Sequence, residues 1–163
     1  IEVKIRMRLS ETYKKVPILA SANINGGSDS DSINMANYHS ASFDLVFGPS
    51  YAGAAGAIVK LYSGASNGAK TTAMTFNYRY GGAAIGSASA DVLSTEATSA
   101  ALQIATATLA SRLLVIEVDA AAMTAGHNWL TVEVGAEADA GELAIVATLV
   151  PRFASAAAIT ALA

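Results

Sequence analysis

Residues 64–68 (GASNG) match the G-x-S-x-G pattern that presents a nucleophilic serine in many hydrolases. Asp91 or Asp119, and then His127, follow Ser66 in the order that such enzymes use. The motif requires a strand before the serine and a helix after it, but the residues that follow, KTTAMTFNY, alternate as a strand does. We therefore interpret the motif as a tight hairpin turn, in which the Asn-Gly pair tolerates positive φ.

The other chemistry-bearing residues do not form a metal or cofactor motif. His39 and His127 have no cysteine, H-x-H or H-E-x-x-H partner, so we expect structural histidines rather than zinc ligands. Asp29 and Asp31 could bind calcium from a loop, but the bidentate acid that closes a calcium loop is missing, which favours a solvated turn. The glycines of residues 81–86 lack the lysine and hydroxyl of a phosphate loop. We expect no enzyme activity, no cofactor and no metal.

Basic residues are concentrated at one end of a chain whose net charge is −3. Such a basic end on an acidic body could suit nucleic acid, a membrane surface or an acidic protein neighbour, although a solvated strand face would give the same pattern. We do not expect nucleic acid, because the basic run has no interleaved aromatics for base stacking. The candidate partner-binding residues here are Lys4, Arg6, Arg8, Lys14 and Lys15.

The composition is that of one soluble domain. The chain has 163 residues and 53% apolar residues, enough for a core of its own. No stretch is long and apolar enough for a membrane span of about 20 residues, and no apolar block follows the basic residues as in a signal peptide. Cysteine is absent, which fits a reducing compartment.

Alternation of apolar and polar residues predicts β-strands along most of the chain. The expected strands are residues 1–9, 41–47, 57–62, 73–80, 99–109, 112–119, 129–134 and 143–150. Residues 20–32 are expected as a loop, and residues 120–126 as one helical turn that Asp119 caps and Gly126 ends.

About eight antiparallel strands with short turns predict an all-β fold, a β-sandwich with jelly-roll topology. We expect a basic arm or strand at residues 1–15, the sandwich at 16–153 and an alanine-rich tail at 154–163. The last strand is apolar on both faces, so either a neighbouring subunit or another part of the chain should cover it. Trp129 lies on the polar side of its strand, which indicates either a partner contact or burial under a loop.

Four segments resemble a family of small tailed-bacteriophage virion proteins that is poorly characterised. They are residues 24–50 (INGGSDSDSINMANYHSASFDLVFGPS), 61–79, 113–123 and 126–134. The similarity spans residues 24–153, and DSINMANYH is its most distinctive part. It implies a phage protein and contributes no catalytic residues. The basic arm and the tail lie outside it.

The resemblance, the size and the expected fold together imply a capsid decoration (cement) protein that binds and stabilises the phage head shell, by analogy with known decoration proteins. Its expected partners are the major capsid protein and further copies of the chain in a homotrimer, on the capsid surface after assembly in the host cytoplasm. Two alternatives stay open: another virion part (head-completion, tail or fibre-associated) and a carbohydrate-binding sandwich module. The last would use exposed aromatics, for which the candidates are Tyr62, Tyr78, Tyr80 and Trp129.

Overall fold

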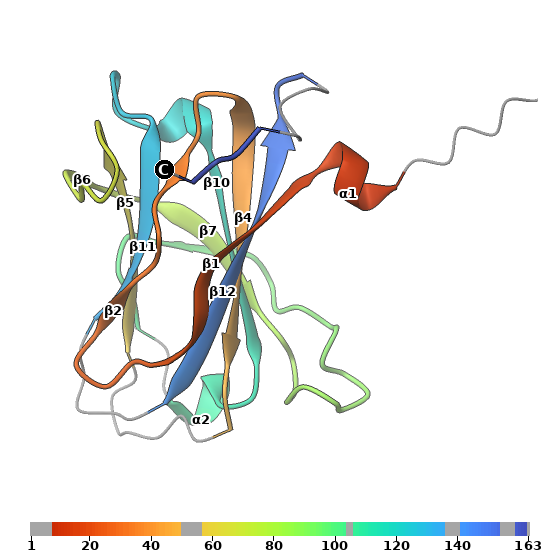
Figure 1. Ribbon diagram of the computed structural model, residues 1–163. Coiled ribbons are helices and arrows are strands. Elements are labelled where there is room, and N and C mark those ends of the chain that lie inside the picture. Colours follow the sequence, from red (N-terminus) through yellow and green to blue (C-terminus); the bar gives the residue numbers. More distant parts are fainter. Residues whose placement is uncertain (1–7, 50–56, 104–105, 136–140, 154–158, 163) are drawn as a thin grey trace, which may run out of the picture.

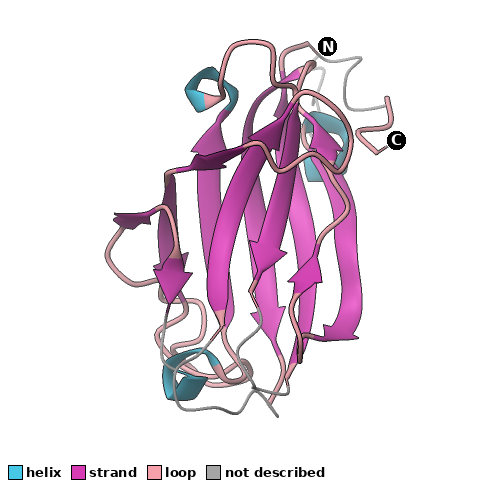
Figure 2. Cartoon of the chain, turned by 90° about the vertical axis from the view of Figure 1, so that its left-hand side faces the viewer, coloured by secondary structure: helices cyan, strands magenta, loops and turns pink. Residues whose placement is uncertain are grey.

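The protein folds into two antiparallel β-sheets packed face to face (Figures 1 and 2). The computed structural model describes residues 8–49, 57–103, 106–135, 141–153 and 159–162. Within these ranges far more residues lie in strands than in helices, and every strand pair is antiparallel. The expectation of an all-β sandwich is therefore confirmed.

Sheet A is six-stranded and runs in the order β1-β12-β4-β10-β7-β8. Its strands are β1 (Lys14–Asn23), β12 (Glu142–Pro151), β4 (Tyr38–Phe47), β10 (Leu113–Asp119), β7 (Phe76–Tyr80) and β8 (Ala97–Ser99). Sheet B runs β2-β11-β5-β6, with β3 paired to β11 and β9 to β5. Its strands are β2 (Ser28–Asp29), β11 (Trp129–Val134), β5 (Ile58–Gly64), β6 (Thr72–Met74), β3 (Ile33–Asn34) and β9 (Leu102–Gln103). The helical turns are α1 (Leu9–Thr12), α2 (Thr106–Leu109) and η1 (Ala120–Ala122).

The strand pairs are nested along the sequence. The pairs β1·β12, β2·β11, β4·β10 and β5·β6 lie one inside the next, alternately in sheet A and sheet B. One long hairpin of strands folded over into two sheets has this order, which is the order of a jelly roll. The jelly roll stays a prediction that the nesting supports, and β7 and β8 extend sheet A beyond it.

The core lies between the sheets and is built by strict alternation along the long strands. On β4, for example, Phe43, Leu45 and Phe47 point inward and are buried, and Leu114 and Ile116 do the same on β10. Each such side chain contributes about 1.5–3 kcal/mol through the apolar surface that it removes from water. The expected strand 73–80 is broken at Thr75, because its first half pairs with β5 in sheet B and its second half with β10 in sheet A.

The prediction of an N-terminal strand at residues 1–9 is wrong for its last residue, Leu9. Residues 1–7 lie outside the described part of the chain, and Leu9 begins the single turn of α1. Local bonds close this turn, since the amides of Glu11 and Thr12 both donate to the carbonyl of Arg8. The first described strand is β1, which extends to Asn23 into the segment expected as a loop.

Two further expectations are corrected. The strand expected at 99–109 contains α2, whose Leu109 is buried in the core. An alanine-rich segment without a long partner strand closes hydrogen bonds locally instead. The turn after β10 is present as η1 and Gly126 has φ +84°, but Asp119 makes no side-chain capping bond.

The described part of the predicted tail, residues 159–162, packs onto the sandwich. Ala161 is buried, and its carbonyl accepts a 2.8 Å hydrogen bond from the amide of Asn34. The hydroxyl of Tyr38 donates to the carbonyl of Ile159 at 3.3 Å. The sandwich therefore extends beyond residue 153, and at its other end it begins with Lys14.

Candidate interaction surface

The outer face of sheet A carries a polar row that crosses the whole sheet. Alternation sends every second residue of each strand outward, and the register then sets these residues side by side. The aligned positions are Lys15, Thr148, Ser42, Glu117, Asn77 and Thr98, one from each of the six strands. At one end of this row Lys15 Nζ donates to Thr148 Oγ1 at 2.5 Å.

A groove of about 350 Å³ lies along this row and the next outward positions beyond it. Ser40, Ser42 and Thr148 line it with hydroxyl groups, and Tyr13, between α1 and β1, lines it from the end of the arm. Its acids are Glu117 and Asp119, which β10 exposes on the same face. Among the residues that the structure describes, neither carboxylate is in an ion pair. The groove is therefore polar and acidic.

The other end of the same face is more apolar, although Asp44 and Arg79 also lie on it. Val146 and Val115 flank Asp44 in one row, and Val46, which is 39% exposed, lies next to Leu113 in the following row. Burial among these neighbours raises the pKa of Asp44 above its ordinary value, and the charge of nearby Lys15 opposes the shift. The face thus joins an acidic groove to an apolar half.

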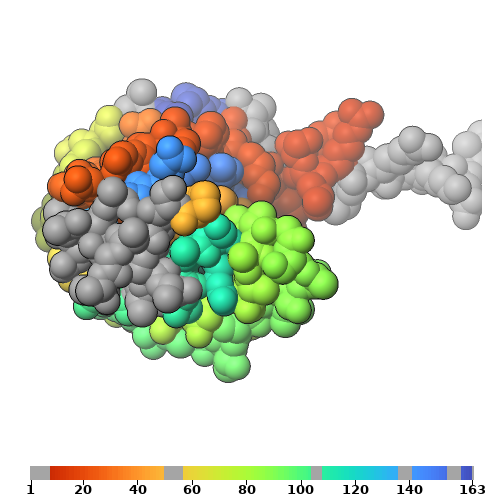
Figure 3. Space-filling model, turned by 90° about the horizontal axis from the view of Figure 1, so that it is seen from below, coloured from red at the N-terminus to blue at the C-terminus, as the bar shows by residue number. Residues whose placement is uncertain are grey.

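Two projections stand at the two ends of this face (Figures 1 and 3). Near the groove, α1 buries none of its side chains, and Leu9 is 72% exposed. Near the apolar half, the loop of residues 81–96 exposes Ile85 (55%) and Val92 (61%). Arg112 holds the base of this loop by donating to the carbonyls of residues 81 and 82. Exposed apolar side chains around an uncovered sheet face are typical of an interaction surface.

The structure separates the residues that the sequence suggested for partner binding. Lys4 and Arg6 lie outside the described residues, and Arg8 is exposed at the start of α1. Lys14 and Lys15 are consecutive on β1, so their side chains leave opposite faces of the strand. Lys15 alone of these two joins the outer face of sheet A.

Trp129 lies elsewhere, on β11 of sheet B, where it is partly exposed and aligned with Asn34 and Gly64. Sheet A and sheet B are opposite layers of the sandwich (Figure 2). Trp129 and Lys15 therefore do not contribute to one contact surface.

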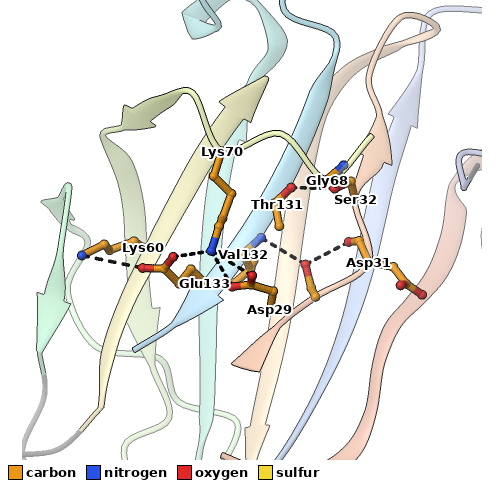
Figure 4. A network of polar contacts seen from close by, with 10 residues as sticks. Asp29, Asp31, Ser32, Lys60, Gly68, Lys70, Thr131, Val132 and Glu133 are labelled. Atoms are coloured by element: carbon orange, nitrogen blue, oxygen red, sulfur yellow. Dashed lines mark hydrogen bonds and ion pairs between the residues drawn. The ribbon is translucent and has the colours of Figure 1, made fainter. Parts of the chain in front are cut away.

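The outer face of sheet B is covered by the loop between β5 and β6, residues 65–71. The amide of Gly68 donates to Ser32 Oγ at 3.0 Å, and Ser32 in turn shares a 2.6 Å hydrogen bond with Thr131 (Figure 4). Both of these hydroxyl side chains are buried although they point away from the core. A polar residue can be buried in this way because its hydroxyl has partners.

Lys70 fastens the same loop to the sheet. Its ammonium group is 2.8 Å from Asp29 and 2.6 Å from Glu133 (Figure 4). The hydrogen bonds that the ammonium group donates to these carboxylates, that to Asp29 foremost, raise the pKa of Lys70. Asp29 was expected in a solvated turn and instead lies on β2 in this ion pair, whereas Asp31 is exposed and makes no ion pair among the described residues. Asp29 thus has a structural role.

Ser66 lies in the loop of a hairpin, as the sequence indicated, but the turn is not the two-residue type. The loop between the strands spans seven residues, 65–71. Within it the amide of Ala69 donates to the carbonyl of Ser66, and only Gly68 of the Asn-Gly pair has positive φ (+75°). That pattern is typical of a type II turn.

His127 contacts a different serine. Its Nδ1 is 2.9 Å from Ser63 Oγ, a pair that no local sequence pattern predicts. Ser63 is 0% exposed, so its hydroxyl cannot meet a substrate in this structure. Within the described ranges, no group of three or more His, Asp or Glu side chains is arranged to hold a metal ion.

Within the described residues, the fold and this surface define a β-sandwich whose sheet A has an uncovered, two-part outer face. The crystal structure of the SPBc2 prophage-derived protein YomS has a similar fold, with a TM-score of 0.51 and 12% sequence identity over 84% of this chain and 91% of that one. No family model and no curated protein sequence matches the chain. As for membranes, none of the helices in the described ranges has the length and apolarity needed to cross one.

Proposed function

We propose that this chain is a structural protein of a phage virion, and specifically a capsid decoration protein that binds and stabilises the head shell. The observation that carries the proposal is the uncovered outer face of sheet A, with exposed Leu9 at one end and Ile85 and Val92 at the other. A surface of this kind binds another protein by burying apolar side chains inside a polar rim.

The fold supports the phage assignment. The similar structure comes from a prophage-derived protein. The segments that resemble phage virion proteins cover most of sheet B and, in sheet A, β4, β10 and most of β7. The most distinctive of them, residues 31–39, supplies buried Ser32, Ile33 and Met35 and the Tyr38 that receives the tail. These residues stabilise the sandwich, so the resemblance indicates a shared architecture rather than a shared binding site.

The proposed role is not enzymatic. The serine of the nucleophile-like motif lies in a hairpin loop, and the serine that contacts His127 is buried. The aromatic residues also do not support a carbohydrate-binding module, which would need a row of exposed rings. Tyr78 and Tyr80 pack against the core, and the ring centroid of Tyr62 lies 6.0 Å from the Lys70 ammonium group, so of the four candidates the partly exposed Trp129 is left without the other three.

The experiment that tests this function is a count of chains per particle. Particles of the phage that encodes the chain are purified, and quantitative mass spectrometry gives its ratio to the major capsid protein. A decoration protein of the capsid surface should approach one copy per capsid subunit. A few copies per particle would instead indicate a head-completion or tail part, and absence from the particle would refute a virion role.

A further inference from the structure

The groove on sheet A offers two exposed negative charges to a partner. Glu117 and Asp119 are two residues apart on β10 and point to the same side, so their side chains are about 6.8 Å apart along the strand. Neither has an ion pair among the described residues. An occupant of this groove should therefore present cations at a spacing of about two strand residues.

The chain itself contains such a segment. In residues 1–8 the cations Lys4, Arg6 and Arg8 recur at every second position, which in an extended chain is the same spacing of about 6.8 Å. Between them lie Ile5 and Met7, whose side chains would leave the opposite side of an extended arm from the cations. The charges and the spacing of this arm both complement the groove.

The arm is placed to serve another molecule. Tyr13 lines the groove, and from there α1 leads Arg8 away from the body of the sandwich (Figures 1 and 3). No side chain of α1 is buried against its own chain, and Leu9 is almost fully exposed. A segment that leaves the rim of its own groove in this direction reaches a neighbouring copy without a reversal of the chain.

We propose that residues 1–8 of one copy bind the acidic groove of a second copy, so that the chain self-associates by exchange of its N-terminal arms. This inference deepens the self-association part of the proposed function. A repeated arm-to-groove contact can close into a ring, the trimer included, because each copy offers one arm and one groove.

Charge reversal on each side tests the proposal. The groove variant is Glu117→Lys/Asp119→Lys and the arm variant is Arg6→Glu/Arg8→Glu. Light scattering at micromolar concentration should show an oligomer of the unaltered protein, and each variant should weaken association roughly tenfold or more because like charges then face each other. Added salt should weaken the unaltered oligomer. The control is Asp31→Lys, which reverses an exposed acid outside the groove and outside the loop of residues 81–96 and should leave association unchanged.

Mixing the two variants is the decisive measurement. The groove variant keeps an intact arm and the arm variant keeps an intact groove, so the mixture should associate although neither variant does so alone. If each arm binds the groove of its own chain, mixing will produce no complex and the proposal fails. A monomeric unaltered protein, or a groove variant that associates normally, would also overturn it. Circular dichroism confirms that both variants are folded.

These outcomes are independent of the particle count. A monomer in solution that still occupies capsids at one copy per subunit would overturn arm exchange and leave the decoration role standing. A charge-dependent oligomer present at a few copies per particle would do the reverse.

Discussion

Gly64 is the position where the smallest added side chain should do the most damage. A Cβ at Gly64 would lie 2.2 Å from the carbonyl oxygen of Ala69 and 2.7 Å from its Cβ. Backbone atoms at such a short distance cannot move aside as a flexible side chain can. Gly64→Ala must therefore push the β5–β6 loop off sheet B. The replacement therefore tests whether this loop is held down as the structure shows.

The expected cost follows from what the displaced loop loses. Overpacking of a well-packed site costs about 1–3 kcal/mol. The buried bond from the Gly68 amide to Ser32 contributes about 0.5–1.5 kcal/mol, and each partly exposed ion pair of Lys70 adds about 0.2–1 kcal/mol. Gly64→Ala should thus lower the free energy of unfolding by about 2–6.5 kcal/mol, a large fraction of the usual stability of about 5–15 kcal/mol.

Urea unfolding measures the loss, and hydrogen exchange locates it at the Gly68 amide. The matched control is Gly68→Ala in the same loop. Its added Cβ meets no atom within 4 Å, but its φ of +75° is strained for alanine, at about 1–2 kcal/mol. The close approach of the loop to β5 would be contradicted by two results together. The free energy of unfolding of Gly64→Ala would lie within about 0.5 kcal/mol of that of the original protein, and the Gly68 amide would stay protected from exchange.

Three further predictions concern other parts of the sandwich. Ile116→Ala should cost about 2–5 kcal/mol in urea unfolding, because Ile116 is fully buried between the aligned residues Phe43 and Tyr78; a smaller loss than in the exposed-site control Val92→Ala would contradict the core. Asp44→Asn should raise the free energy of unfolding at pH 7, because a raised folded-state pKa means that the ionised carboxylate opposes folding. This gain in stability should shrink as the pH falls toward 3.8. Thermal melts across that pH range measure it. Lys70 has a raised pKa, so its contribution to the free energy of unfolding is present below pH 10.5 and is lost as the pH rises above that value. Thermal melts of Lys70→Met should lack this alkaline loss of stability. An identical loss in both proteins would show that the ion pairs are not formed.

The alternation rule predicted the strands whose two faces have different surroundings. On β4, β10 and β11, inward residues are buried in one core and outward residues reach solvent or the loop, so the sequence shows a period of two. The same rule did not find β1, where Pro17 interrupts the polar-apolar pattern and register shifts follow on both sides of Leu19. A proline is tolerated there because β1 is an edge strand.

The groove could not be predicted from local patterns. Glu117 meets Ser42 and Thr148 only because β10, β4 and β12 are neighbours, and this order follows from the global pairing of strands. The pairing of Ser63 with His127 depends in the same way on β5 lying beside β11. The basic arm, by contrast, was visible in the sequence because its charges repeat within a few residues.

The nested strand pairing also determines when the protein can fold. Lys15 and Thr148 are hydrogen-bonded neighbours separated by 133 residues of chain, and β12 fills the position between the edge strand β1 and β4. During synthesis, β1 and one edge of β4 therefore have no partner until β12 has left the ribosome. Topologies dominated by such distant pairings fold in milliseconds to seconds, and their unpaired edges are prone to aggregate in the meantime. Copies of this chain made together are therefore exposed to misassembly before they are folded, and removal of the last twenty residues should abolish folding rather than trim an edge.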